Sequence, residues 1–233
     1  MKITFVPFVL LISMVVCVSL NAGEQKYRVT KLIDKGWIKG RITHSRSDLE
    51  MPKLEVDRDK GACGNESRKI MAVDIGPDGA LSNTVVYLKE IAAGKDFVLP
   101  ATPPTLTQEH CNFSPHVQLV PQFSSVRITN HDQILHSVHA YQFEPGQKFV
   151  LYPNSISSPS RTLFNIAMVA QRKESFQQLG EAGIVKTVCD AGHYWMTAYF
   201  VVMQHPYFAK VESDGSYKYR GCAARKIQSG ELA

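Results

Sequence analysis

The stretch "IVKTVCDAGHYWMTAYFVVM" (residues 184–203) decides the fold, because it has the form of two strands joined by a short loop. Apolar and β-branched residues fill both ends, and Gly192 allows the chain to turn between them. Cys189, His193 and Met196 lie in this loop or at its edges. The stretch therefore predicts a β-hairpin that carries three metal-binding side chains at one end of a sheet.

Short runs of the same β-forming character recur along most of the chain. Turn dipeptides such as Asp78-Gly79 and Asp214-Gly215 separate them, a spacing that is typical of a β-sandwich or barrel. We therefore predict an all-β fold. A helix is expected only at "QRKESFQQLGEAG" (171–183), and the proline-rich "LPATPPTLTQE" (99–109) is expected to be a loop or linker. The other predicted strands are "GWIKGRI", "KIMAVDI", "NTVVYLKEI", "VQLV", "SVRITN" and "HSVHAYQF".

The N-terminal segment "MKITFVPFVLLISMVVCVSLNA" (1–22) has one lysine, then an apolar run, then small and polar residues up to Ala22. This pattern predicts a secretory signal peptide, and a retained membrane anchor is the alternative. We expect no membrane span in the mature chain, which would reach the periplasm or the cell exterior. The formal net charge is +5, and the charges are scattered, so nucleic acid is not an expected partner.

One more donor is needed before the loop at 184–203 can form a metal site. A trigonal copper site uses two histidines, one cysteine and a long, weak methionine bond, whereas zinc, the rival metal, is seldom held by a thioether. The segment "SVRITNHDQILHSVHAY" (125–141) offers His131, His136 and His139. Side chains alternate along a strand, so His136 and His139 should point to opposite faces. We choose His136, near a strand end, which gives the ligand set His136, Cys189, His193 and Met196.

Four motifs occur in order along the chain: "CNFSPH" (111–116), "NHDQILHSVH" (130–139), "CDAGHYWM" (189–196) and "HPYF" (205–208). Together they resemble the cupredoxins, the plastocyanin-like blue copper proteins, and are most similar to the exported bacterial plastocyanin-like proteins of the methylamine-utilisation type. The sequence departs from that pattern twice. The ligand loop has one extra residue between Cys189 and His193, and the chain ends in "RGCAARKIQSGELA" where a further strand is expected.

The resemblance implies a cupredoxin-like Greek-key β-sandwich with extra N-terminal strands. Residues 23–212 would form this domain, and 213–233 a divergent C-terminal tail. It also implies one copper ion per chain and a one-electron carrier that is not an enzyme, with a redox partner such as a c-type cytochrome or a periplasmic redox enzyme. Two alternatives remain: a copper storage, delivery or sensing module, and a metal-free extracellular β-sandwich that binds other molecules.

The remaining cysteines of the mature chain allow three pairings among Cys63, Cys111 and Cys222. The region that resembles the cupredoxins contains the first two, so the resemblance favours a disulfide between Cys63 and Cys111.

His116 and His139 are expected to pack or to support the ligands. We expect His193 to be the ligand nearest the surface, with its ring edge open to electrons and with Tyr194 and Trp195 beside it.

Overall fold

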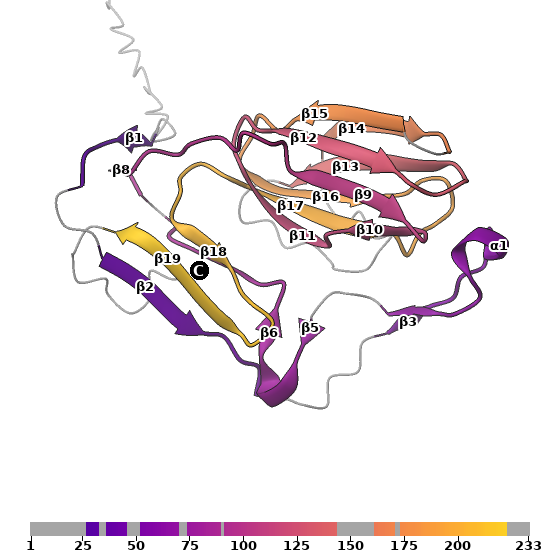
Figure 1. Cartoon of the computed structure of the whole chain (residues 1–233), viewed down its shortest axis with the longest axis horizontal. Coiled ribbons are helices and arrows are strands. Elements are labelled where there is room, and N and C mark those ends of the chain that lie inside the picture. Colours follow the sequence, from indigo (N-terminus) through magenta and orange to yellow (C-terminus); the bar gives the residue numbers. More distant parts are fainter. Residues whose placement is uncertain are drawn as a thin grey trace, which may run out of the picture.

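The computed structural model describes residues 27–32, 36–45, 52–69, 74–89, 91–143, 161–170 and 173–222 (Figure 1). The predicted signal peptide and the end of the chain after residue 222 lie outside these ranges. Within them, no helix has the length and apolar character needed to span a membrane.

The body of the molecule consists of two sheets, which lie together at the right of Figure 1. One has five strands in the order β11-β17-β16-β13-β14, and the other has four in the order β10-β9-β12-β15. The predicted all-β sandwich is therefore confirmed. The strands of the first sheet are Val117–Pro121 (β11), His136–Phe143 (β13), Arg161–Met168 (β14), Gly183–Val188 (β16) and Thr197–Met203 (β17). Those of the second are Thr105–Glu109 (β9), Asn112–Ser114 (β10), Ser125–Asn130 (β12) and Lys173–Gln178 (β15).

The connections between the sheets have the Greek-key character of many sandwiches. From β14 the chain crosses to β15 in the second sheet, then returns as β16 between β13 and β17. Alternate residues of β13, including Val138 and Ala140, are fully buried in the apolar core between the sheets. This alternation sets the inward face of β13, and His136 lies on that same face at the strand's first position.

Two expectations from the sequence are wrong. Residues 173–178 of the expected helix form β15, which pairs antiparallel with β12, and the side chains of residues 174–178 alternate in exposure as on a strand. Residues 105–109 of the expected loop form β9, parallel to β12. Ladder pairing outweighs the weak helix preference of the first segment. In the second, the prolines end at Pro104, just before the ladder begins, so they remove no hydrogen bond from it.

The expected extra N-terminal strands are present, and they meet the C-terminal part of the chain. Gly36–Arg41 (β2) pairs with Ser216–Cys222 (β19), and Val85–Tyr87 (β7) pairs with Phe208–Lys210 (β18). β19 thus lies in the segment assigned to a divergent tail. A second, smaller apolar core packs here, formed by Val86, Leu88, Tyr207, Val211 and Tyr219. The remaining elements are β1 (Arg28–Val29), β3 (Lys53–Leu54), α1 (Lys60–Cys63), β4 (Arg68–Lys69), β5 (Asp74–Ile75), η1 (Pro77–Gly79), β6 (Leu81–Ser82) and β8 (Ala93–Gly94).

Candidate metal centre

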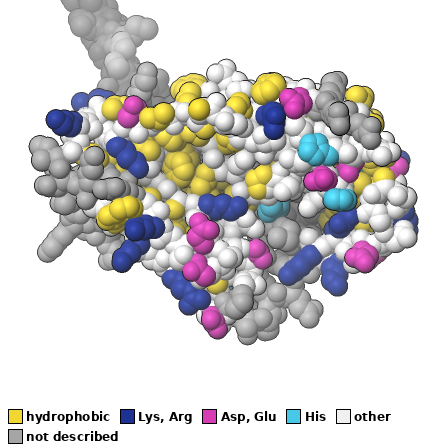
Figure 2. All heavy atoms as spheres, viewed as in Figure 1, with side chains coloured by type: hydrophobic (Ala, Val, Ile, Leu, Met, Phe, Trp, Pro, Cys, Tyr) yellow, Lys and Arg dark blue, Asp and Glu magenta, His cyan; other side chains and the backbone are white. Residues whose placement is uncertain are grey.

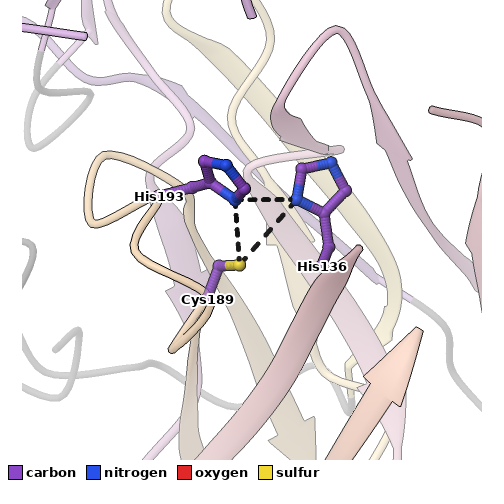
Figure 3. Close-up of side chains that lie close together, drawn as sticks. All are labelled: His136, Cys189 and His193. Carbon is purple, nitrogen blue, oxygen red and sulfur yellow. Dashed lines mark hydrogen bonds between the residues drawn. The ribbon is translucent and has the colours of Figure 1, made fainter. Parts of the chain in front are cut away.

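Three of the four predicted ligands converge inside one end of the sandwich (Figure 3). The Nδ1 atoms of His136 and His193 are 3.0 Å apart, and the Cys189 Sγ lies 3.9 and 3.6 Å from them respectively. His136 and His193 are 0% exposed and Cys189 is 4% exposed. Two imidazole nitrogens that face each other out of water need a proton or a cation between them. The donor set therefore fits a metal ion bound by two nitrogens and one thiolate.

Adjacent strands place these donors. His136 begins β13, and Cys189 directly follows β16, the neighbour of β13 in the sheet. Gly192 then has a φ of 95°, a left-handed conformation that favours glycine, and the chain turns back so that the Met196 N–H donates to the His193 carbonyl at 2.9 Å. Cys189 and His193 thus sit at either side of one tight turn and face the first residue of the neighbouring strand.

The Asp132 carboxylate orients His136. The His136 Nε2 donates to Asp132 Oδ2 at 2.8 Å, so its Nδ1 is left to face the centre. Asp132 is itself held by the backbone N–H groups of His110 and Cys111, at 2.7 and 2.8 Å. Burial alone would raise the pKa of Asp132, but these hydrogen bonds, together with the one from His136, lower it below its ordinary value. The carboxylate therefore stays ionised and fixes the ring in the orientation that ligation needs.

Asp59 does the same for His193. The His193 Nε2 donates to Asp59 Oδ2 at 2.9 Å, and again Nδ1 points inward. Burial tends to lower the pKa of His193, but hydrogen bonds and charge interactions with Cys189 and Asp59 raise it overall. Both histidines are thus carboxylate-linked on the outer nitrogen and free to ligate through the inner one, the arrangement typical of metal-bound histidine.

The surroundings of Cys189 favour the thiolate form of its side chain. Burial would raise its pKa, but hydrogen bonds to His136, His193 and the backbone N–H groups of Ser137 and Ala191 lower the pKa to about 6. The Ser137 N–H lies 3.3 Å from Sγ. Among the cysteines whose side chains the structure describes, Cys189 alone is unbridged, and a thiolate is the form that binds metal.

The fourth predicted ligand, Met196, is fully buried in the main core and directly precedes β17. Its backbone is tied to the His193 carbonyl. Its ligation through sulfur stays a prediction.

The expectation of an exposed His193 ring edge is wrong. A segment from the N-terminal part of the chain covers this histidine, with Asp59 on its outer nitrogen. The side chains of the two aromatic residues after it are both hydrogen-bonded to backbone carbonyls. The Tyr194 hydroxyl donates to the Glu55 carbonyl at 2.8 Å, and the Trp195 Nε1 donates to the Cys111 carbonyl at 2.9 Å. No surface route through the His193 ring is open in this arrangement.

The two histidines that were expected to pack or to support the ligands, His139 and His116, lie outside the donor cluster. His139 is on the opposite face of β13 from His136, as strand alternation predicts, and hydrogen-bonds to Asp190 at 2.6 Å and Thr162 at 2.9 Å. The His116 Nδ1 donates to the Thr197 carbonyl at 2.9 Å, which ties β11 to the strand after the ligand loop.

The predicted disulfide is present between Cys63 and Cys111. Cys111, Asp132 and His136 also lie close enough to form a metal-binding group, but the Cys111 sulfur is used in the disulfide and is not available as a thiolate. Asp132 and Asp59 were missed as supporting residues. The first could have been found from its position four residues before His136, whereas nothing near Asp59 in the sequence points to the loop.

No protein-family model and no curated protein sequence matches this chain. Among solved structures, a purple cupredoxin from Nitrosopumilus maritimus is similar at 16% identity and a TM-score of 0.33, over 43% of this chain and 99% of that one. Amicyanin from Paracoccus versutus is similar at 16% identity and a TM-score of 0.33, over 45% of this chain and 85% of that one. A copper-containing nitrite reductase from Thermus scotoductus is similar at 15% identity and a TM-score of 0.31, over 49% of this chain and 25% of that one. The solved structures that this chain resembles thus include cupredoxins and one copper enzyme, and the likeness concerns the fold alone.

Proposed function

We propose that this protein is an exported cupredoxin-like carrier that binds one copper ion through His136, Cys189 and His193, with Met196 as a weak axial ligand. The observation that carries the proposal is the convergence of two inward Nδ1 atoms and a low-pKa thiolate, all within 4.8 Å of one another and all buried. Two imidazoles and one thiolate, with a thioether beyond them, form the donor set of blue copper sites. Copper bound there would supply a one-electron couple.

The supporting hydrogen bonds favour electron transfer. Fast transfer needs ligands that move little between the two oxidation states. His136 is held by Asp132, His193 by Asp59, and the Cys189 sulfur by the Ser137 N–H. Since two of these ligands also belong to or adjoin paired strands, the chain resists rearrangement at the centre.

Burial of the donors favours a carrier over an enzyme. Catalytic metal sites keep a position open for substrate or water, whereas all three donors here are nearly or fully buried. Burial likewise argues against a delivery module, whose metal must be exchanged readily.

We further propose that residues 1–22 direct export and that the partner is a redox protein such as a c-type cytochrome or a periplasmic redox enzyme. The Cys63–Cys111 disulfide suits an oxidising compartment. On the face shown in Figure 2, positive and negative side chains are interspersed, a distribution that suits a soluble partner more than a polyanion.

The test is the visible absorption spectrum of the copper-loaded protein. Wild type should bind one copper and show an intense band from thiolate-to-copper charge transfer, and Cys189→Ser should lose that band. Ser125→Ala, at the exposed first position of β12, is the control and should keep it. A band that survives in Cys189→Ser would refute the ligand assignment.

A further inference from the structure

We propose that residues 52–69, here called the cover segment, form a disulfide-locked cover that must open before metal enters or leaves the centre, and that Asp59 within it is a positioning residue for His193. The inference rests on the proposed metal site and goes beyond it, because it assigns a role to a segment outside the sandwich. The cover segment comprises β3, α1 and β4 and lies at the far right of Figure 1.

The cover segment contacts three consecutive parts of the ligand loop. The Asp59 carboxylate accepts from the His193 Nε2 at 2.9 Å. The Arg58 Nη1 donates to the Ala191 carbonyl at 3.2 Å. A Cβ at Gly192 would overlap the Arg58 guanidinium, so the Arg58 side chain lies directly against the loop at this residue.

Further contacts fasten the cover segment on both sides of Asp59. Val56 is 2% exposed and belongs to the main apolar core. The Tyr194 hydroxyl donates to the Glu55 carbonyl at 2.8 Å. Three residues before Asp59 and four residues after it, the segment is therefore anchored to the sandwich, at Val56 by packing and at Cys63 by a covalent bond.

The covalent anchor connects the cover segment to the region that supports both histidines. Cys63 is bonded to Cys111, whose backbone N–H donates to Asp132 and whose carbonyl accepts from the Trp195 Nε1. The Arg68 Nη2 donates to the carbonyls of Cys63 and His110, at 2.6 and 3.2 Å. The disulfide thus joins the segment that contains Asp59, the partner of His193, to Cys111, whose backbone holds Asp132, the partner of His136.

These contacts have a consequence for metal exchange. His193 is fully buried although it lies in a loop, and the outer edge of its ring is occupied by Asp59. A chelator can take the metal only after His193 swings away, and that movement first breaks the hydrogen bond to Asp59. Asp59 itself is about half exposed, so its replacement removes an acceptor from the ring without leaving a hole in the core.

The test measures how fast bicinchoninate removes Cu(I) from the ascorbate-reduced, full-length mature protein. Asp59→Ala should release copper about tenfold faster or more, the size of effect typical when a partner of a metal-bound histidine is lost. Asp59→Asn keeps an oxygen that can accept from Nε2 and should recover part of the wild-type rate, whereas Asp59→Gly, which also tolerates the φ of 48° at this position but has no acceptor, should not. Glu66→Ala removes an exposed acidic side chain of the same segment and should leave the rate within about twofold of wild type.

A second experiment removes the disulfide between Cys63 and Cys111. The double variant Cys63→Ser and Cys111→Ser should also release copper faster, and combining it with Asp59→Ala should add little, because both changes open the same cover. Unchanged circular dichroism of the metal-free variants separates positioning from general unfolding.

Equal release rates in wild type, Asp59→Ala and the double variant would overturn the proposal. A wild-type protein that gives no charge-transfer band would instead overturn the copper function. The cover would then be tested by the same comparison with Co(II), whose visible absorption reports its own removal by EDTA. Faster removal of Co(II) from Asp59→Ala would support the cover, and equal rates would reject it.

Discussion

At the residue scale, the two histidines show how a hydrogen bond selects the donor atom of a ligand. Each presents Nδ1 to the centre because a carboxylate binds its Nε2. The candidate ligands could be predicted from the sequence, since they lie in two short motifs whose spacing follows from strand alternation and a tight turn. Asp59 could not, because it is 134 residues away from His193 along the chain and only the tertiary fold brings the two together.

The Met196 side chain separates a carrier from a delivery module. A weak axial thioether tunes the reduction potential while the other three ligands hold the metal. Met196→Gln should therefore lower the potential, because an oxygen donor favours oxidised copper, and should keep copper bound at close to one ion per chain. Voltammetry and metal analysis of the same sample measure both quantities.

The matched control for Met196→Gln is Met203→Gln, which places the same amide at the other end of β17. It should leave the potential at the wild-type value. Loss of copper from Met196→Gln, with no definable potential, would count against a carrier and in favour of a site in which the thioether captures the metal.

At the element scale, strand pairing determines the secondary structure of segments whose local sequence is compatible with either a helix or a strand. Strands β13, β16 and β17 were predicted because their apolar residues follow strand patterns, whereas β15 has polar, helix-compatible residues and becomes a strand only through its ladder with β12. The burial of Lys186 could likewise not be predicted from the local sequence. Lysine side chains are mostly exposed in folded proteins, yet Lys186 lies in β16, between β13 and β17 in the sheet, and is fully buried.

Burial lowers the pKa of Lys186 from 10.5 to about 8. Between these values the unfolded chain holds a proton that the folded chain has released, so this residue makes the free energy of unfolding rise with pH across that window. The rise is at most ~3.5 kcal/mol, since one pKa unit corresponds to ~1.4 kcal/mol. Lys186→Met should lack this contribution, so denaturant unfolding between pH 8 and 10 should show its stability advantage over wild type shrinking as pH rises.

The control for that experiment is Lys39→Met, at an exposed position of β2. Its unfolding free energy should follow the wild-type slope with pH. A Lys186→Met slope equal to that of wild type would show that Lys186 does not change its protonation on unfolding within this window.

At the scale of the whole molecule, the described residues form two separate apolar cores, and only one of them contains proposed ligands. The larger lies between the sheets and includes Cys189 and Met196, whereas the smaller joins the N-terminal strands to β18 and β19. The sequence predicted the sandwich and the presence of extra strands. It did not predict that β2 and β19 pair, because strands at opposite ends of a chain have no local signal that matches one to the other.

The division into two cores predicts that stability and the metal site can be altered separately. Leu88 is 6% exposed in the smaller core and Leu106 is 1% exposed in the larger one. Truncation of either to alanine should lower the free energy of unfolding by about 2–4 kcal/mol, since each removes buried methyl groups and leaves a cavity. Val98→Ala, at a position that is 76% exposed, should change it by less than about 0.5 kcal/mol.

The two truncations should differ at the metal. Leu88 packs in a core that contains none of the proposed ligands, so Leu88→Ala should leave the visible band and the reduction potential of the copper-loaded protein unchanged. Leu106 shares its core with Cys189 and Met196, so Leu106→Ala should disturb one or both. Denaturant unfolding of the metal-free proteins gives the stabilities, and absorption with voltammetry gives the state of the centre. A shift of potential in Leu88→Ala as large as that in Leu106→Ala would mean that the smaller core helps to hold the ligands. Strands β2 and β7 would then belong to the metal-binding unit.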